Sequence, residues 1–323
     1  MTGRRCLVTG GAGFIGSNMC RRLLREGCRV RILDNFSTGR RSNILDLDGD
    51  VELLEGDLRS YHTVKTAVRG IEVVYHLGAL PSVPRSIADP ITTNEVNVQG
   101  TLNVLHAALD EGVGRVVFAS SSSIYGDSAD GRKSEDMTPA PLSPYAVSKL
   151  AGETYCRVFT HVYGLETVCV RYFNVFGPYQ DPGSHYSAVI PLFATAILDG
   201  RRPVIYGDGR QSRDFTYVDN VVHANLLAAE SKSAAGMTMN AACGTGVSVA
   251  ELARRMLELL GRPDLEPVHE PERPGEVRHS VADTTLARRL LGYEPLVCFE
   301  EGLEAALEHF RSLREKGPVR PGP

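Results

Sequence analysis

The chain lacks the segments that would place a protein in or across a membrane. No hydrophobic run approaches the roughly 18 residues of a membrane span. Residues 2–8 reach a glycine cluster too soon to hold the core of a signal peptide. The seven cysteines include no C-x-x-C pair, and an odd, scattered set is typical of reduced thiols. We therefore expect a cytoplasmic protein with no membrane partner.

Two further ligand classes find no support in the sequence. The 35 basic and 39 acidic residues give a net charge of −4, which provides no basic footprint for nucleic acid. None of the nine histidines shows the spacing of metal ligands, such as H-x-x-x-H, so we expect no metal site. Any anionic ligand would have to be held by local arginines.

What the sequence does contain is a glycine-rich turn between an apolar run and a helical pattern. Residues 6–9 are apolar, Gly10-Gly11-Ala12-Gly13-Phe14-Ile15-Gly16 follows, and the helical pattern stops at Gly27. This order predicts a dinucleotide site. Gly10 permits the tight turn, Gly13 lets the backbone approach a pyrophosphate, and Gly16 lets the helix lie close to the strand. The helix N-terminus offers free N–H groups to the phosphates.

Acidic residues follow the next two predicted strands. Asp34 ends the second strand, where a carboxylate accepts hydrogen bonds from the adenosine ribose and repels a 2′-phosphate, which favours NAD over NADP. Arg40 and Arg41 come shortly afterwards and leave some tolerance of NADP open. Asp57 follows the third strand, and it either bonds the adenine amine or caps a helix.

Strands and helices alternate through the first half of the chain. We predict strands at 6–9, 30–33, 51–54, 73–79, 116–119 and 166–170 and a helix at 94–111. This alternation implies an α/β fold, a Rossmann-type doubly wound parallel sheet, with ligands beyond the carboxyl ends of its strands. After Pro178 the alternation is lost. We therefore expect an NAD-binding domain at 1–176, a smaller C-terminal α/β substrate domain at 177–310, part of whose chain can return to the first domain, and a flexible tail at 311–323.

A tyrosine and a lysine lie four residues apart on another predicted helix. Ser143 and Pro144 suit its cap and first position, and Tyr145 and Lys149 then share one face. An ammonium beside a phenol lowers the phenol pKa from about 10, which makes Tyr145 a candidate base. A chance Y-x-x-x-K pair on an exposed helix is the alternative. The four serines at 120–123 are either a polar loop or a source of a hydroxyl at the reacting carbon.

With these motifs and Arg171-Tyr172-Phe173-Asn174 in place, the chain resembles the extended short-chain dehydrogenase/reductase family. Within it the chain is similar to the nucleotide-sugar 4-epimerases, and most to the UDP-N-acetylhexosamine branch. Residues 34–39, 82–85, 180–182, 188–191, 212–215 and 277–280 carry this similarity. It implies NAD as the cofactor, a UDP-sugar as the substrate and a homodimer formed by the helices at 97–110 and 145–163.

The resemblance also implies a role for each site residue. In the catalytic set, Tyr145 exchanges a proton with the sugar 4-hydroxyl, Lys149 bonds the nicotinamide ribose, and Ser121 bonds the 4-oxygen. The cofactor-binding set is Gly10, Gly13, Phe14, Ile15, Gly16, Asp34, Asn35, Ser37, Thr38, Gly39, Asp57, Leu58, Leu77, Ala79, Asn97, Ser120, Tyr145, Lys149 and Tyr172. The substrate-binding set is Arg85, Ser121, Ser122, Asn174, Gln180, Ala188, Val189, Val204, Tyr206, Arg213, Arg273, Glu276 and Ser280.

The resemblance implies 4-epimerisation through a transient 4-keto sugar. The related dehydratases and decarboxylases carry an acid after the active-site hydroxyl, whereas Ser122, Ser123 and Ile124 follow Ser121 here. Ser280 with Ala188 leaves room for a 2-N-acetyl group, so we rank UDP-GlcNAc/UDP-GalNAc first, UDP-glucose/UDP-galactose second and UDP-glucuronate third. A dehydratase or decarboxylase and a non-catalytic NAD-binding sensor remain the alternatives.

Overall fold

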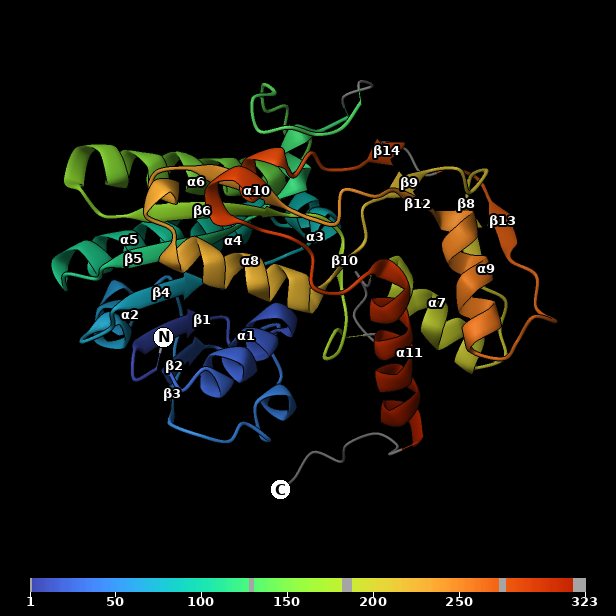
Figure 1. The fold of residues 1–323 in the computed structure, drawn as a ribbon, viewed down its shortest axis with the longest axis horizontal. Helices are drawn as coiled ribbons and strands as arrows, with labels where there is room; N and C mark the ends of the chain where they lie inside the picture. The colour runs from blue at the N-terminus through green and yellow to red at the C-terminus, as the bar shows by residue number, and fades with distance from the viewer. Residues whose placement is uncertain (1, 128–130, 182–187, 273–276, 316–323) are drawn as a thin grey trace.

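A seven-stranded parallel sheet forms the centre of the protein in the computed structural model, which describes residues 2–127, 131–181, 188–272 and 277–315 (Figure 1). The strand order is β11-β6-β5-β4-β1-β2-β3, and every neighbouring pair is parallel. The strands are β1 (Arg5–Thr9), β2 (Arg29–Asp34), β3 (Val51–Glu55), β4 (Val73–His76), β5 (Arg115–Ser121), β6 (Thr167–Tyr172) and β11 (Thr238–Ala241). The order reverses between β1 and β4, which confirms the predicted doubly wound fold.

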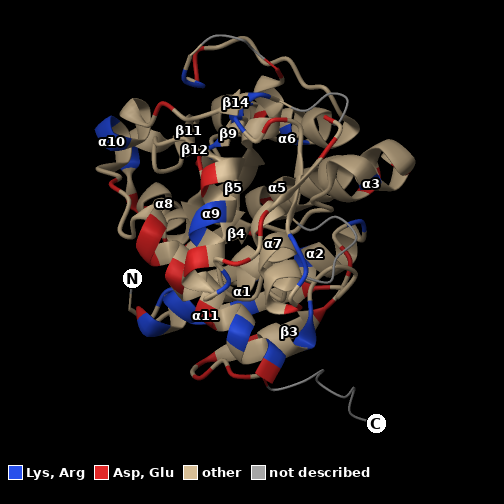
Figure 2. Cartoon of the chain, turned by 90° about the vertical axis from the view of Figure 1, so that its right-hand side faces the viewer, with Lys and Arg blue, Asp and Glu red and all other residues tan. Residues whose placement is uncertain are grey.

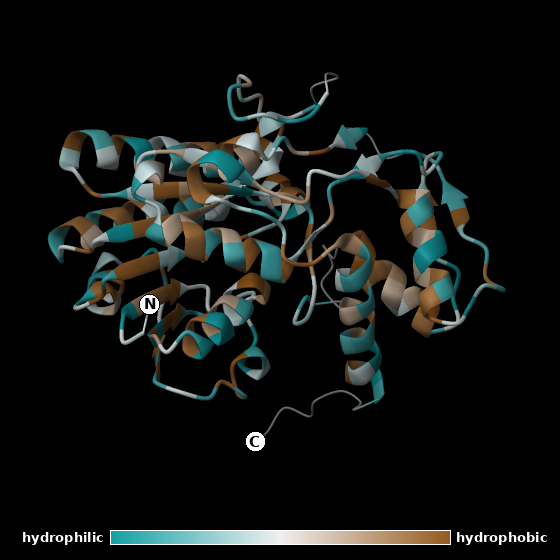
Figure 3. Cartoon of the chain, viewed as in Figure 1, coloured by the Kyte–Doolittle hydropathy of each residue, from teal (hydrophilic) through white to brown (hydrophobic). Residues whose placement is uncertain are grey.

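Helices cover both faces of this sheet. One face carries α1 (Phe14–Arg25) and α8 (Val218–Glu230), and the other carries α2 (Tyr61–Val68), α5 (Gly100–Asp110) and α6 (Pro144–Tyr163). Successive strand residues point to opposite faces, so Val8 joins the core under α1 whereas Leu7 joins the core under α2 and α5. Figure 3 shows the apolar strands between helices whose outer faces are polar.

The helix predicted at 94–111 starts earlier and is built from three pieces. It comprises α4 (Pro90–Asn94), a π-helical turn at Glu95–Gln99 and then α5. Asp89 caps α4 by accepting a hydrogen bond from the Thr92 N–H over 3.0 Å, and Pro90 takes the first helical position. The short α3 (Val83–Ala88) precedes it.

From residue 175 on, the chain builds a smaller unit and then returns to the first sheet. The smaller unit has three small sheets, β10-β7, β12-β9-β14 and β13-β8. Its helices and strands are α7 (Val189–Leu198), α9 (Val249–Leu259), α11 (Phe299–Glu315), β7 (Val175–Phe176), β8 (Val204–Tyr206), β9 (Ser212–Arg213), β10 (Thr216–Tyr217), β12 (Val247–Ser248), β13 (Val268–Glu270) and β14 (His279–Ser280). Helix α8, strand β11 and helix α10 (Thr285–Leu291) pack on the first unit.

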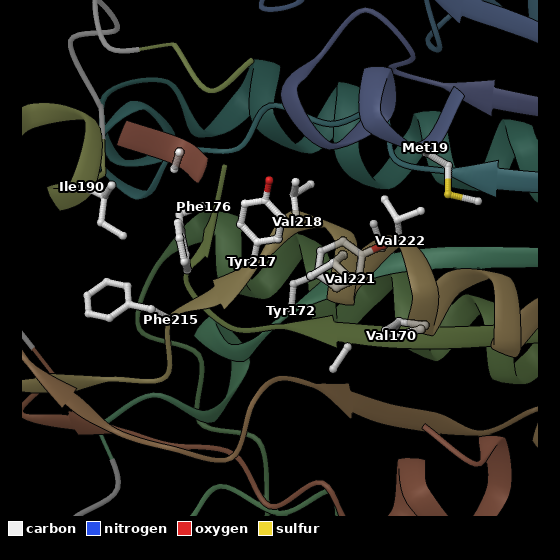
Figure 4. Close-up of a cluster of buried hydrophobic side chains, with 14 of the residues drawn as sticks. Met19, Val170, Tyr172, Phe176, Ile190, Phe215, Tyr217, Val218, Val221 and Val222 are labelled. Atoms are coloured by element: carbon white, nitrogen blue, oxygen red, sulfur yellow. The ribbon is translucent and has the colours of Figure 1, made fainter. Parts of the chain in front are cut away.

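One apolar core joins the two units. It runs from Met19 and Val170 in the first unit to Phe215 in the second (Figure 4).

The predicted tail begins inside a helix, because α11 continues to Glu315. Acidic and basic residues are interspersed along α9 and α11 (Figure 2). No helix in the described part of the chain has the length and apolar character to span a membrane.

Candidate active site

A cavity of about 750 Å³ opens at the carboxyl ends of the central strands. All of the predicted cofactor residues except Asn97 line it, namely Gly10, Gly13, Phe14, Ile15, Gly16, Asp34, Asn35, Ser37, Thr38, Gly39, Asp57, Leu58, Leu77, Ala79, Ser120, Tyr145, Lys149 and Tyr172. Of the predicted substrate residues, Arg85, Gln180 and Ala188 line it as well. The cavity is therefore large enough, and suitably placed, for a dinucleotide.

The glycine turn at the base of the cavity tolerates no larger residue at two positions. Gly10 has a φ of +69°, and a Cβ there would lie 2.7 Å from Gly78 Cα. A Cβ at Gly16 would lie 2.0 Å from the carbonyl oxygen of Gly10. Helix α1 therefore begins directly against β1 and presents its N-terminus to the cavity. This cradle fits a pyrophosphate.

Asp34 fixes the loop beside that turn. Its carboxylate accepts hydrogen bonds from the backbone N–H groups of Ala12, over 2.9 Å, and Phe36, over 2.8 Å. Burial raises the pKa of Asp34, and these backbone bonds oppose the rise. Each carboxylate oxygen keeps a lone pair, so Asp34 can still accept a hydrogen bond from a ribose hydroxyl.

Asp57 does not cap the following helix, because Ser60 takes that position. The Ser60 hydroxyl accepts a hydrogen bond from the Thr63 N–H. Asp57 instead accepts hydrogen bonds from the Asn35 amide, over 2.9 Å, and from the Arg59 guanidinium. The Arg59 bonds lower the pKa of Asp57 to about 2. Asp57 is therefore an ionised acceptor at the edge of the cavity.

Arg40 and Arg41, whose charges could favour binding of NADP, are both paired with acidic residues. Arg40 bonds Asp181, and Arg41 bonds Glu55 while its guanidinium lies 4.0 Å from the centre of the Phe36 ring. Arg40 and Asp181 both line the cavity. Their pairing leaves less positive charge for a 2′-phosphate, which agrees with a preference for NAD.

Tyr145 and Lys149 share one face of α6, as predicted, with Ser143 as its cap. The Lys149 ammonium donates a hydrogen bond to the Ala119 carbonyl over 2.8 Å and lies 6.0 Å from the centre of the Tyr145 ring. The predicted lowering of the Tyr145 pKa by Lys149 is wrong. Burial raises the pKa of Tyr145, and a hydrogen bond with Ser121 opposes the rise. Burial also lowers the pKa of Lys149, to about 8.

The serines at the end of β5 have separate partners. The Ser121 hydroxyl lies beside the Tyr145 phenol, where it opposes the rise in the tyrosine pKa, and it accepts a hydrogen bond from the Ser123 N–H over 3.1 Å. Ser122 begins a 3-10 turn (Ser122–Tyr125), and neither it nor Ser121 is among the residues that line the cavity. Ser121 is therefore the serine that the fold brings to the tyrosine.

Asn97 lies behind the cavity wall rather than on it. Its amide accepts a hydrogen bond from Leu80 N–H over 2.8 Å and donates to the Leu80 carbonyl, over 3.2 Å, and to the Ser148 hydroxyl, over 3.0 Å. Leu80 lines the cavity. The π-helical turn carries Asn97 to this position, so Asn97 supports the cofactor loop through Leu80.

The remaining predicted substrate residues lie away from the cavity lining. Asn174 is exposed with a φ of +34°, and Val189 starts α7. Val204 and Tyr206 lie on β8, and Arg213 on β9 pairs with Ser280 on β14. Arg273 and Glu276 lie outside the described residues. The structure thus groups Arg213 with Ser280 but does not bring this set into the cavity.

Several lining residues had not been predicted, among them Pro81, Ser82, Val96, Ala119, Tyr179 and Asp181. Tyr179 has a φ of +69°, and its ring lies 3.8 Å from the Arg21 guanidinium. These contacts join segments far apart in the sequence. The Gly177-Pro178 pair predicts a turn before Tyr179, but it does not predict which part of the chain Tyr179 then contacts.

The comparison with known families decides where this chain belongs. The model of the NAD dependent epimerase/dehydratase family matches residues 6–242. The chain belongs to this family. As a member of the extended short-chain dehydrogenase/reductase superfamily, it uses NAD as its cofactor, and the glycine cradle and the Asp34 loop fit that cofactor.

Relatives of this epimerase/dehydratase family member cover nearly its whole length. A UDP-glucose 4-epimerase of Mycolicibacterium smegmatis is 39% identical, over 95% of this chain and 99% of its own. The structure of a UDP-N-acetylglucosamine 4-epimerase from Methanobrevibacter ruminantium is similar with a TM-score of 0.92 and 38% identity, covering 97% of this chain and 99% of its own. That of a Thermus thermophilus UDP-glucose 4-epimerase with NAD has a TM-score of 0.86 and 38% identity, covering 98% and 100%. Decarboxylases and dehydratases are also among the relatives.

Proposed function

We propose that this protein is a 4-epimerase of UDP-hexoses, acting on UDP-GlcNAc and UDP-GalNAc and also on UDP-glucose and UDP-galactose. The observation that carries the proposal is the placement of Ser121 beside the Tyr145 phenol, with Lys149 on the same face of α6. The carboxylates among the described lining residues are Asp34, Asp57 and Asp181, and Asp181 is paired with Arg40. This arrangement supports proton exchange at one hydroxyl rather than elimination or decarboxylation.

The proposed chemistry is a reversible oxidation at the sugar C4. NAD, when bound, supplies that oxidation and its reversal. Tyr145 takes the proton of the 4-hydroxyl as a 4-keto sugar forms and returns it afterwards, while Ser121 bonds the 4-oxygen. Because the pKa of Tyr145 is raised, a free phenolate is disfavoured, and a charged Lys149 would act by holding the nicotinamide ribose beside Tyr145. Protein and cofactor together end each cycle unchanged.

Anchoring through the nucleotide would leave the sugar free to turn between the two half-reactions. In this proposal Asn174, Arg213 and Arg273 hold the diphosphate, Glu276 the uridine ribose, and Val204 and Tyr206 the uracil. Residues 1–176 would serve the cofactor and residues 177–310 the UDP-sugar. Arg213 is half-buried on β9, directly beside Ser280 on the next strand.

The choice of an N-acetylated sugar has support at Gln180. Its amide oxygen is buried and has no hydrogen-bond partner among the described residues. Gln180 lines the cavity, as does Ala188, whose side chain is small. A buried acceptor is costly unless a ligand donor satisfies it, and an acetamido N–H would do so. Asp181 beside Gln180 disfavours the carboxylate of UDP-glucuronate.

We also propose that the protein is a cytoplasmic homodimer, formed by the helices α5 and α6. Helix α6 exposes an apolar stripe of Val147, Val158 and Val162 at i, i+11 and i+15, which is one helix face. Ile91 is exposed on α4, which packs beside α6. A second copy of the chain would cover this surface.

The deciding experiment is incubation of the protein with UDP-GlcNAc, followed by NMR detection of UDP-GalNAc, and the same with UDP-glucose. Conversion in both directions is expected. A 4-keto-6-deoxy product or release of carbon dioxide from a UDP-uronate would instead indicate a dehydratase or decarboxylase. Bound NAD without conversion of any UDP-sugar would indicate the non-catalytic alternative.

A further inference from the structure

A buried ion pair lies directly beneath the cavity. The Arg171 guanidinium on β6 donates to both carboxylate oxygens of Glu153 on α6, each over 2.8 Å. The Ser120 hydroxyl at the end of β5 donates to the same carboxylate over 2.5 Å. Only 3% of Ser120, 6% of Glu153 and 4% of Arg171 is exposed. Three elements of the sheet and its cover therefore meet at one carboxylate.

The pair continues into a second set of buried hydrogen bonds. Arg171 also donates to the Tyr125 hydroxyl over 2.8 Å, and that hydroxyl donates to Asn240 on β11 over 2.7 Å. The Asn240 amide donates to the backbone carbonyls of Lys133, over 2.9 Å, and Asp283, over 3.0 Å. The guanidinium is thus held from two sides, which fixes the orientation of the pair.

Stability alone is a poor explanation for such a pair. Removing two charges from water costs about as much as their attraction returns, and apolar replacements are often as stable. The position of the pair next to active-site residues is a better explanation. Ser120 is the neighbour of Ser121, and Glu153 lies one helical turn after Lys149 on the same face of α6.

We propose that Glu153 and Arg171 are positioning residues of the active site. Their ion pair anchors Ser120, and with it the turn that presents Ser121 to Tyr145. It also places one fixed negative charge, balanced by Arg171, a helical turn from the Lys149 ammonium. The inference rests on the proposed function, because it assigns the pair to the residues that carry that chemistry.

Glu153 is the charged carboxylate that acts on Lys149. The other ionisable groups facing Lys149 are Tyr145 and Cys156 on its own helix, His76 on β4 and Tyr172 on β6. His76 is neutral, since burial lowers its pKa to about 3, and burial raises the pKa of Tyr172. Burial lowers the pKa of Lys149 to about 8, and Cys156 and, to a smaller extent, Glu153 oppose that fall.

The test removes the charge of Glu153 and measures the pKa of Lys149 directly. The chain has only five lysines, so the NAD-loaded protein labelled with [ε-¹³C]lysine gives a simple NMR spectrum in which Lys149→Met assigns the Lys149 signal. Glu153→Gln leaves Arg171 as an unbalanced cation, and the pKa of Lys149 is expected to fall from about 8 by at least one pH unit. At pH 7.5 a one-unit fall lowers the charged fraction, and with it kcat, by about threefold, with KM unchanged.

Two matched variants separate charge from packing. Glu153→Gln/Arg171→Met removes both charges and should shift the pKa of Lys149 less than Glu153→Gln alone. Tyr125→Phe removes a neutral hydrogen bond to Arg171 and should leave that pKa unchanged.

Ser120→Ala keeps the ion pair and is expected to lower kcat without changing the pKa of Lys149. This variant decides the anchoring role should Glu153→Gln not fold.

An unchanged Lys149 pKa in folded Glu153→Gln, or full kcat in Ser120→Ala, would overturn the assignment. The NMR titration needs no substrate. A wild-type protein that converts no UDP-sugar but shows the pKa pattern would therefore contradict the proposed function alone.

Discussion

The hydroxyl of Ser121 lies close enough to the phenol of Tyr145 to oppose the rise in its pKa, although one residue ends strand β5 and the other lies in the first turn of helix α6. The contact exists because the carboxyl end of β5 and the N-terminus of α6 border the same cavity. Two neighbouring hydroxyls can pass a proton to and from one substrate oxygen. This arrangement is what the proposed exchange at a single carbon requires.

Replacing Tyr145 with phenylalanine removes this exchange while preserving the shape of the ring. We expect turnover of UDP-GlcNAc to fall by about 10²–10⁴-fold, the usual contribution of a positioned acid or base, with NAD content and Tm unchanged. NMR of the product mixture measures the loss. Tyr163→Phe, an exposed position on the same helix, is the control and should retain full activity.

The pH dependence of turnover should follow the charge of Lys149. Its pKa is lowered to about 8, so the ammonium that would hold the nicotinamide ribose in the proposed site is present below pH 8 and is lost as the pH rises above it. We expect kcat to decline above about pH 8, in steady-state assays at saturating substrate. A constant kcat up to pH 10 would exclude this role.

Asp34→Asn should weaken the binding of NAD. One carboxylate oxygen becomes an NH2 group that faces a backbone N–H of Ala12 or Phe36, so the loop loses a bond and the ribose loses an acceptor. A loss of about 1–3 kcal/mol is expected, or roughly 5–150-fold in Kd. Calorimetric titration of NAD and NADP measures both, and NAD should lose more than NADP.

Asp214 offers a test of the smaller unit. This fully buried carboxylate accepts the backbone N–H groups of Cys243, Gly244 and Ala282 over 2.9–3.1 Å. Asn cannot accept all three, so Asp214→Asn should lower the free energy of unfolding by about 1–3 kcal/mol. Urea denaturation measures this change. Asp219→Asn, an exposed position on α8, should have little effect.

The apolar stripe on α6 predicts the behaviour of a dimer. Val162→Asp places a charge where a second copy would pack, and we expect the molecular mass measured by light scattering to fall from about twice that of the chain to that of one chain. Leu313→Asp on α11, also exposed, should leave the mass unchanged. A wild-type monomer would contradict the proposal.

Features set by neighbouring residues were predictable from the sequence. The glycine turn, Asp34 at the end of β2 and the Tyr145–Lys149 spacing depend on strand and helix periodicity within short segments, and each lies where the pattern placed it. They all border one cavity because the carboxyl ends of parallel strands lie at the same edge of the sheet.

Features set by distant contacts were not predictable. The pairing of the Asn97 amide with Leu80 and the joining of Glu153 to Arg171 depend on how helices sit on the sheet. The pKa of Tyr145 was misjudged for a related reason: burial depends on the assembled fold, and it outweighs a neighbour on the same helix. Glu153, four residues after Lys149, was the one available signal, and it looks like any helix-surface acid.

The position of β11 at the edge of the central sheet limits how this chain can be divided. A fragment ending at residue 176 would leave the hydrogen-bonding edge of β6 open and uncover the sheet face under α8. Such a fragment would be prone to self-association rather than serving as a portable cofactor module. A chimera that joins the cofactor-binding part of one relative to the substrate-binding part of another would have to take residues 218–241 from the same protein as the central sheet.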